Sequence, residues 1–373
     1  MFPILELKGN AFERGRLHGE LARERVHRSL ANYRALFEHA GLGWDEAQAI
    51  AGRFAPVIRE LDASLYEEIE GIAAGSGRKT SEILALNART EILPPTFPEK
   101  ASPEWLAAMR KGADLGECTA IAVLPGRSAN GKTLLAQNWD WLGGQRDCLV
   151  LLRASTGAHA CLTLTEAGML AKIGLNSRGF GVCLNILRSR DDGLSLGVPV
   201  HVVLRKLLEC ADVAEAERLL KRLKYASSSN ILCADAKGGS ASFEVSPVAI
   251  GVVRQSDGTL CHTNHFLVAA AQRSVVGPPA SLSSEPRLAR AEAVARERVK
   301  HDLDSVKALL RDETDGLLSI CRKPDPALPE LVRVETVASV VMELSARVMH
   351  IAPDVPSRCD YEPVALEAEA AVH

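Results

Sequence analysis

Apolar residues recur at helical spacing in the first third of the chain and in short, strand-like runs after residue 118. Positions three and four residues apart are typical of amphipathic helices, and short apolar runs between turn residues are typical of strands. The first third is therefore predicted to be mainly helical. A strand is expected at residues 4–7, followed by helices at residues 11–39, 44–54, 57–75 and 81–91.

Glycine recurs at the start of this helical region, as Gly9, Gly15 and Gly19. Glycine weakens a helix by about 1 kcal/mol relative to alanine, so its presence there requires a reason. We expect close packing of another backbone segment, with a mobile turn as the alternative.

Residues 93–115 contain four prolines and several charges, and are expected to form an exposed connector. The short strands beyond it are separated by close turns, which favours antiparallel pairing. Strands are expected at residues 119–124, 133–139, 148–154, 159–165, 169–176, 181–186, 229–234, 240–245, 250–255, 336–344 and 346–351, and helices at residues 199–210, 213–223, 286–300 and 303–311. This order predicts an α+β fold with packed sheets and helices outside them.

The composition is ordinary for a globular protein, with 47% hydrophobic and 24% charged residues and a net charge of −3. A nearly neutral chain offers no electrostatic basis for binding nucleic acid. Nine cysteines without a Cys-x-x-Cys pair indicate reduced thiols rather than a disulfide framework. We find no secretory signal and no apolar run of about 20 residues, and expect a cytoplasmic protein with no membrane segment and a small-molecule partner.

Residues 126–133 read GRSANGKT and match the phosphate-loop pattern. A phosphate loop must open a helix whose N-terminal amides bind the phosphates, but the residues that follow are strand-like. Asn130-Gly131 is instead the dipeptide best suited to a two-residue hairpin turn. We therefore expect a hairpin between the strands on either side, and no nucleotide site.

This hairpin would place Cys118 close to Asp140 at one edge of a sheet. A cysteine with a carboxylate and with Asn138 nearby is a candidate nucleophile. The alternative is that Cys118 is a small buried hydrophobic residue, the usual fate of cysteine. Its place between the polar first third and the strands favours the nucleophile.

His262 and His265 are spaced as a metal pair would be, but the sequence around them lacks the further ligands that zinc needs. We expect histidines of a loop or of an active-site wall, and no metal or cofactor. We also expect no serine hydrolase of the α/β type.

Several segments together resemble the penicillin acyltransferase (acyl-coenzyme A:6-aminopenicillanate acyltransferase) family of self-cleaving N-terminal nucleophile hydrolases. The matches extend over most of the chain and keep the family's order. They are Gly9, Gly15 and Gly19, then residues 67–75 (EEIEGIAAG), 84–91 (LALNARTE), 118–120 (CTA), 137–141 (QNWDW), 175–179 (LNSRG), 229–230 (SN) and 262–266 (HTNHF).

The resemblance implies an αββα sandwich of two mainly antiparallel sheets between helical layers. It also implies that the chain cuts itself between Glu117 and Cys118. Residues 1–117 would then be a small, helix-rich chain and residues 118–373 a large catalytic chain, and the two would remain associated in one composite domain. A homo-oligomer is a further expectation.

The same resemblance assigns roles to particular residues. Cys118 is the expected nucleophile, and its freed α-amine is the expected base. Asp140 would orient both groups, and Asn230 would stabilise the oxyanion. Arg287 corresponds best to the family's arginine near the nucleophile, with Arg290 as the second choice and a solvated helix face as the alternative for both.

Substrate binding is expected to involve Gln137, Asn138, Asn185, Asn264 and His265. Gln137 stands where related hydrolases carry arginine, and Asn185 has an alternative as a strand-end asparagine satisfied by hydrogen bonds. A second departure is Glu117, because the family pattern before the nucleophile is Asp-Gly-Cys. A carboxylate beside the scissile bond either assists or slows the cut.

The leading hypothesis is a self-cleaving amidohydrolase or acyltransferase that acts on a linear amide or an N-acyl amine through a thioester. One alternative is a non-catalytic binding protein on the same fold, with Cys118 unprocessed. Another is a cysteine peptidase that pairs Cys118 with His262 or His265. The sequence does not distinguish hydrolysis from acyl transfer, because one thioester serves both.

Overall fold

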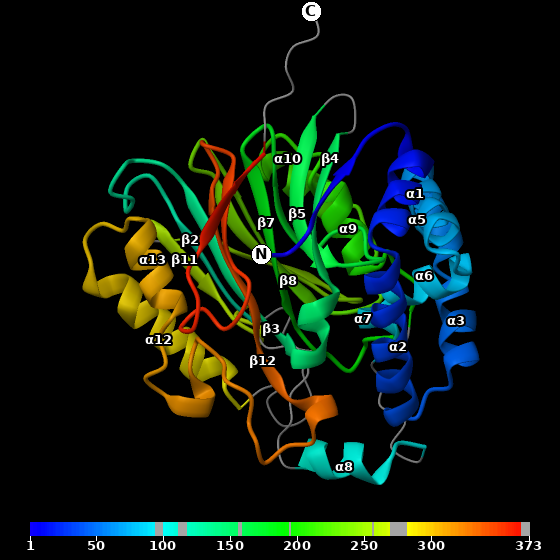
Figure 1. The fold of residues 1–373 in the computed structure, drawn as a ribbon. Helices are drawn as coiled ribbons and strands as arrows, with labels where there is room; N and C mark the ends of the chain where they lie inside the picture. The colour runs from blue at the N-terminus through cyan, green and yellow to red at the C-terminus, as the bar shows by residue number, and fades with distance from the viewer. Residues whose placement is uncertain are drawn as a thin grey trace, which may run out of the picture.

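The computed structural model describes residues 1–93, 100–110, 118–155, 159–193, 195–255, 257–268 and 282–366. Two β-sheets lie face to face, with helices on the outer side of each (Figure 1). This architecture confirms the predicted α+β sandwich with four layers in the order α, β, β and α.

The larger sheet has eight strands, and all its neighbours are antiparallel except β1 and β4, which are parallel. In spatial order its strands are β1 (Ile4–Leu7), β4 (Leu149–Ser155), β5 (Ala160–Glu166), β6 (Ile173–Asn176), β7 (Phe180–Ile186), β8 (Ser229–Asp235), β9 (Ser240–Val245) and β10 (Ile250–Val253). Because β1 belongs to the first third of the chain, the two predicted chains share this sheet.

The smaller sheet has six strands and is antiparallel throughout. In spatial order they are β11 (Thr259–His262), β2 (Cys118–Val123), β3 (Leu134–Leu142), β12 (Val334–Glu343), β13 (Val348–Ala352) and β14 (Glu362–Ala365). The two sheets meet where β2 and β3 pack on β7. The predictions from sequence did not include β11 and β14.

Most helices of the first third cover one side of the molecule and are blue to cyan in Figure 1, whereas α8 (Pro103–Arg110) lies apart from them at the bottom of this view. The others are α1 (Ala11–Leu21), α2 (Arg23–His39), α3 (Trp44–Gly52), α4 (Ala55–Leu61), α5 (Ala63–Ser76), α6 (Thr80–Asn87) and α7 (Arg89–Ile92). Two later helices, α9 (Val200–Leu207) and α10 (Val213–Leu220), come between β7 and β8 in the chain, and α10 packs on the larger sheet. Helices α12 (Ser284–Glu297) and α13 (Leu303–Leu310) cover the smaller sheet. Short 3-10 helices lie at Gly143–Cys148, Gly316–Leu318 and Glu330–Val332.

Several predicted elements differ from the observed ones. The helices expected at residues 57–75 and 81–91 are each divided in two, at Asp62 into α4 and α5 and at Ala88 into α6 and α7. The single helix expected at residues 11–39 is broken at Ala22, whose φ of −110° and ψ of 21° end α1 and begin α2. Part of the expected exposed connector is the helix α8, which buries Trp105 to 3% exposure. An indole ring supplies more apolar area than the neighbouring charges and prolines suggest, which explains why this part is not an exposed loop.

Close packing explains the glycines of the first helices. Helix α1 crosses α5 so tightly that a Cβ at Gly15 would lie 2.0 Å from the Glu68 carbonyl oxygen. A Cβ at Gly71 would lie 2.2 Å from the Phe12 carbonyl oxygen. Real Cβ atoms do not approach a backbone oxygen so closely, so the predicted backbone packing is confirmed for this pair of helices.

We expect Gly71→Ala to destabilise the protein by at least about 2 kcal/mol, because the new methyl group overlaps a backbone that cannot move aside cheaply. Gly52→Ala is the matched control, since a Cβ at Gly52, in α3, meets no atom within 4 Å. Urea unfolding followed by circular dichroism measures both. Equal stability of the two variants would contradict this account of the α1 and α5 contact.

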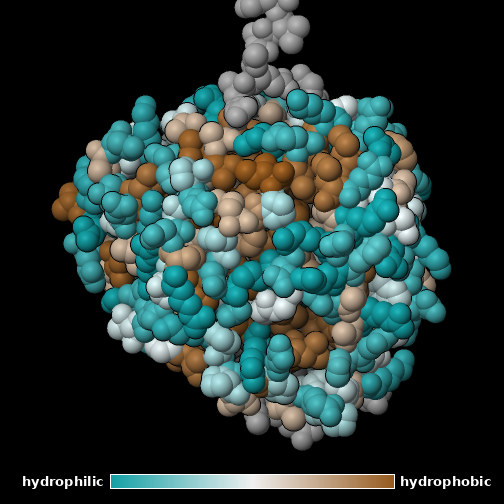
Figure 2. Space-filling model, viewed as in Figure 1, coloured by the Kyte–Doolittle hydropathy of each residue, from teal (hydrophilic) through white to brown (hydrophobic). Residues whose placement is uncertain are grey.

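Among the described residues, none of the helices combines the length and the apolar character needed to cross a bilayer. On the face drawn in Figure 2, hydrophobic side chains gather over the sheets, and hydrophilic ones dominate the rim. The expected homo-oligomer remains a prediction.

Candidate active site

Cys118 is the first residue of β2 and is buried to 2% exposure. Strands β2 and β3 form the predicted hairpin, with Cys118 opposite Trp139. The Cys118 Sγ atom lies 4.0 Å from the Asp140 carbonyl oxygen, which confirms the predicted proximity of these two residues. Glu117, on the other side of the predicted cut, lies outside the described residues.

The predicted two-residue turn of this hairpin is wrong, because the longer loop of residues 124–133 joins the strands. This loop pairs with His301. The His301 N–H donates to the Arg127 carbonyl, and the His301 carbonyl accepts from the Ala129 N–H. It leads into a strand, so residues 126–133 lack the helix N-terminus that a phosphate loop needs.

Three side chains hold the backbone of Cys118. Its N–H donates to Asn264 Oδ1 at 2.7 Å, and its carbonyl oxygen accepts from Arg287 Nη1 at 2.7 Å and from Asn185 Nδ2 at 3.1 Å. Arg287 Nη2 also donates to Asn264 Oδ1 at 2.9 Å. All four residues are buried, so the polar backbone atoms on both sides of the Cys118 Cα are fixed.

The elements around β2 bring these side chains together. Asn264 follows β11, the neighbour of β2, and its Nδ2 donates to the Ile186 carbonyl at 2.9 Å. Arg287 is in the first turn of α12, and Asn185 is near the end of β7 in the opposite sheet. Arg287 also donates to Thr119 Oγ1 at 3.0 Å, a partner that the sequence did not suggest.

Arg290, the second choice for the arginine, lies away from Cys118. It donates through Nη2 to Asp312 Oδ2 at 2.7 Å, and its side chain is 30% exposed. Arg287, and not Arg290, therefore lies beside Cys118, and its chemical role remains a prediction.

Asn230 reaches Cys118 through Asn185. The two asparagines are direct partners on β8 and β7, and Asn230 Nδ2 donates to Asn185 Oδ1 at 3.0 Å. Ser242 Oγ donates to Asn230 Oδ1 at 2.6 Å. The result is a buried chain of amides that ends on the Cys118 carbonyl oxygen, and the oxyanion role of Asn230 remains a prediction.

Asp140 is fully buried beside Cys118, and Thr336 Oγ1 on β12 donates to its Oδ1 at 2.6 Å. The β12 and β3 pairing shifts register between Thr336 and Ala338. A β-bulge of this kind commonly directs a side chain near an active site. The orienting role expected of Asp140 is a prediction that this position permits.

Gln137 and Asn138 have partners in the core. The Gln137 side-chain amide bonds both backbone groups of Leu184, which joins the two sheets. Asn138 Nδ2 donates to the carbonyls of Leu310 and Ile320 at 2.8 and 2.9 Å, on the side covered by α13. The structure thus gives both residues packing roles that the sequence did not indicate, and their part in substrate binding remains a prediction.

Both histidines of the 262–266 segment have other partners. His262 Nε2 lies 2.8 Å from Glu244 Oε1, with both residues fully buried. His265 Nδ1 lies 2.7 Å from Ser284 Oγ and its side chain is half-buried. Within the described ranges neither ring contacts the Cys118 thiol, and three or more His, Cys, Asp or Glu side chains nowhere gather as a metal site would require.

The charges around Cys118 act in opposite directions on its thiol. Burial raises the pKa of the Cys118 thiol, and the carboxylate of Asp140 raises it further. The positive charges of Lys172 and Arg287 lower it. Lys172 is a buried lysine that sequence analysis did not single out, although its apolar neighbours Ala171 and Ile173 could have drawn attention to it.

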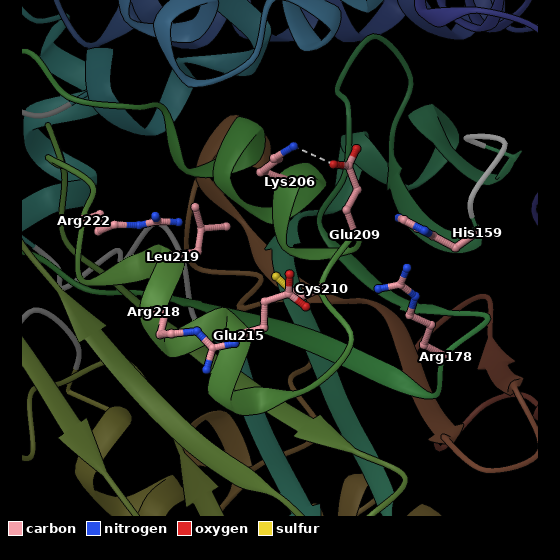
Figure 3. A pocket seen from close by; sticks show the side chains of 9 residues that line it. All are labelled: His159, Arg178, Lys206, Glu209, Cys210, Glu215, Arg218, Leu219 and Arg222. Carbon is pink, nitrogen blue, oxygen red and sulfur yellow. Dashed lines mark hydrogen bonds and ion pairs between the residues drawn. The ribbon is translucent and has the colours of Figure 1, made fainter.

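A separate cavity of 400 Å³ opens near the ends of α9 and α10 (Figure 3). Its walls carry both charges, including those of Arg178, Glu209, Glu215 and Arg218. None of the predicted site residues lines it, so this cavity is distinct from the surroundings of Cys118.

Comparison with known proteins gives consistent results. The family described as acyl-coenzyme A:6-aminopenicillanic acid acyl-transferase matches residues 127–358. The 40 kDa form of acyl-coenzyme A:6-aminopenicillanic-acid-acyltransferase from Emericella nidulans is 29% identical over 332 residues, which cover 84% of this chain and 83% of that protein.

Two solved structures show weaker similarity. Penicillin V acylase from Agrobacterium tumefaciens is 15% identical with a TM-score of 0.46, over 63% of this chain and 83% of that chain. Conjugated bile acid hydrolase from Clostridium perfringens is 12% identical with a TM-score of 0.47, over 69% of this chain and 100% of that chain.

Proposed function

The chain belongs to the acyl-coenzyme A:6-aminopenicillanic acid acyl-transferase family and is an enzyme. We propose that it is a self-processing amidohydrolase or acyltransferase with Cys118 as its nucleophile. The observation that carries the proposal is the clamp on the Cys118 backbone. Asn264, Arg287 and Asn185 fix the amide nitrogen and the carbonyl of this cysteine. An enzyme whose base is the α-amine of its own nucleophile needs that nitrogen to be held in place.

Processing follows from the chemistry of the thiol. The Cys118 thiolate attacks the Glu117 carbonyl carbon, and the Cys118 nitrogen leaves with a proton as the peptide bond breaks. Water then hydrolyses the resulting thioester, which yields the Glu117 carboxylate, the free thiol and the α-amine of Cys118. Residues 1–117 and 118–373 become the small and large chains.

Contacts across the cut support continued association of the two chains. Strand β1 pairs with β4 along Ile4–Leu7. Asn87 of the small chain donates to the Gly168 carbonyl and accepts from the Leu170 N–H, both at 2.9 Å. Separation would expose a sheet edge and these buried polar groups, which is unfavourable.

The freed amine is suited to act as a base. An α-amine has a pKa near 8, whereas a lysine side chain lies near 10.4. The Arg287 charge would lower the pKa of the Cys118 amine further, because like charges disfavour the protonated form. Asn264 Oδ1, already 2.7 Å from the Cys118 nitrogen, would keep the amine beside the thiol.

In turnover the thiol would attack a substrate carbonyl, and the amine would carry the thiol proton to the leaving group. Asn230, fixed by Asn185 and Ser242, is the proposed donor to the oxyanion. Loss of one such donor typically reduces the rate by about a hundred- to a thousand-fold. The acyl group on Cys118 then passes to water or to an amine.

Acyl transfer from an N-acyl amide or an acyl thioester tests the proposal. We expect acid-quenched protein to carry the acyl group on Cys118, detected by peptide mass spectrometry. Added amine should divert product from free acid to new amide without changing the rate at which the acyl-enzyme forms. Product formation with no acyl group on Cys118 at any quench time would contradict the mechanism.

A further inference from the structure

Lys172 is a buried cation on the inner side of the site, with an exposure of 2%. It ends the connection between β5 and β6, and its N–H donates to Thr163 Oγ1 at 3.3 Å. The first third of the chain anchors this connection, since the Gly168 N–H donates to His18 Nε2 at 3.0 Å and Asn87 bonds Gly168 and Leu170. Lys172 is therefore held in a fixed position.

Its ammonium group faces the nucleophile's strand pair. Lys172 Nζ lies 3.8 Å from the ring centroid of Trp139 and 5.7 Å from that of Trp141. Trp139 is the direct partner of Cys118, and directly opposed residues of an antiparallel pair project from the same face of the sheet. The lysine charge and the Cys118 thiol thus share the buried space on that face.

Within the described part of the chain, Lys172 forms no ion pair with a carboxylate. Glu166, whose charge favours the charged form of Lys172, is bonded by Tyr33 Oη and by Arg89 Nη2. Arg89 also lies over the Trp141 ring at 4.5 Å. Glu166 is therefore already paired with Arg89. The ammonium group of Lys172 lies over the Trp139 ring, beside the thiol.

The pKa shifts of Lys172 and of its neighbour His201 agree with this arrangement. Burial, together with the charge of Arg89, lowers the pKa of Lys172 to about 7, while Glu166 and the Cys118 thiolate favour its charged form. His201, at the start of α9, is fully buried, and its pKa is lowered by burial and by the charges of Arg89 and Lys172, so it stays neutral.

The same coupling is visible from the thiol. Lys172 is the largest influence that lowers the Cys118 pKa, ahead of Arg287, and it opposes burial and Asp140. The neighbouring Cys183 has its pKa raised by burial and by Cys118, so it remains a thiol.

We propose that Lys172 is a positioning residue for the nucleophile, whose ammonium charge stabilises the Cys118 thiolate in the space between the two sheets. The proposal rests on Cys118 being the nucleophile. It matters most before the cut, when the Cys118 nitrogen is still an amide and offers no base. The thiolate that starts processing then depends on the charges around it.

The pH dependence of Cys118 alkylation tests this proposal. Iodoacetamide reacts with the thiolate, and mass spectrometry of the Cys118 peptide separates this thiol from the other eight cysteines. With a pKa of about 7, Lys172 is charged near neutrality and loses its charge before the Cys118 thiol titrates at higher pH. In Lys172→Met we therefore expect alkylation of Cys118 at pH 7 to be about five-fold slower than in wild type, as for a charge that lowers a pKa by about one unit and is half present. Lys172→Arg keeps its charge and should be alkylated at least as fast as wild type at pH 7.

Lys307→Met is the matched control, since Lys307 also lies over an aromatic ring, that of Tyr361 at 5.5 Å, on the far side of the smaller sheet. It should leave the rate of Cys118 alkylation at pH 7 unchanged. An unchanged rate at pH 7 in folded Lys172→Met, compared with wild type in the same processing state, would overturn the proposal. A purely structural role would instead lower stability in both Lys172 variants without changing this rate.

A second measurement covers the case in which Lys172→Met does not fold. Because Lys172→Arg keeps its charge at the pH where the Cys118 thiol titrates, the midpoint of Cys118 alkylation should lie lower in this variant than in wild type. Equal midpoints in folded Lys172→Arg would overturn the proposal. The masses of the same samples show whether the chain is cut, so failure of the proposed function is recognised separately.

Discussion

Cys118→Ala is expected to remain one chain of 40.1 kDa and to lose turnover. Removing a nucleophile that works as a unit with its base lowers the rate by as much as about a million-fold, so activity should fall to background. Because the change removes only a sulfur atom from a buried site, the fold should persist with a stability loss of about 1 kcal/mol. Intact mass, acyl-substrate turnover and thermal unfolding measure the three effects.

Cys183→Ala is the matched control for this variant. Cys183 is fully buried on β7, close to the nucleophile, and its Sγ lies 3.9 Å from the Ala136 carbonyl oxygen. It should be processed and should turn over within about two-fold of wild type. Processing or turnover that survives in Cys118→Ala would contradict the mechanism, and ligand binding without either reaction in both variants would favour a binding protein.

Arg287→Met should have the second-largest effect. This buried guanidinium donates to the Cys118 carbonyl, Thr119 Oγ1 and Asn264 Oδ1. Methionine fills similar space but donates no hydrogen bond, so the clamp on the Cys118 nitrogen and carbonyl loosens. We expect processing and kcat to fall by about a hundred-fold or more, comparable to the loss of one transition-state donor.

Arg287→Lys should recover little, because an ammonium group cannot reproduce the planar fork that reaches three acceptors. Arg290→Met, one helical turn further along α12, is the control. Its ion pair with Asp312 is partly exposed and should contribute less than about 1 kcal/mol. Rates of processing and turnover, measured separately, decide the matter. An Arg287→Met enzyme as active as Arg290→Met would exclude Arg287 from the mechanism.

Sequence reasoning predicted well the features that short stretches of chain determine. The strand-like runs on either side of Asn130-Gly131 identified the hairpin of β2 and β3 and the proximity of Cys118 and Asp140. The glycines at 15 and 19 predicted close backbone packing, although not that α5 would supply the partner. The turn of the hairpin was wrong because contacts with His301, far along the chain, stretch the loop.

The remaining features depend on contacts between distant segments. Asn230 lies next to Asn185 only because β7 and β8 are neighbours in register. The core contacts of Gln137 and Asn138 arise from β7 and from the end of α13. Lys172 is buried because the first third of the chain packs on the loop that carries it. This contact joins segments that are distant in the sequence.

Intact mass and N-terminal sequencing of the purified wild-type protein test the central claim most directly. The account predicts two associated chains, one of which begins at Cys118 with a free amine. A single chain of 40.1 kDa that nevertheless turns over acyl substrate would contradict it.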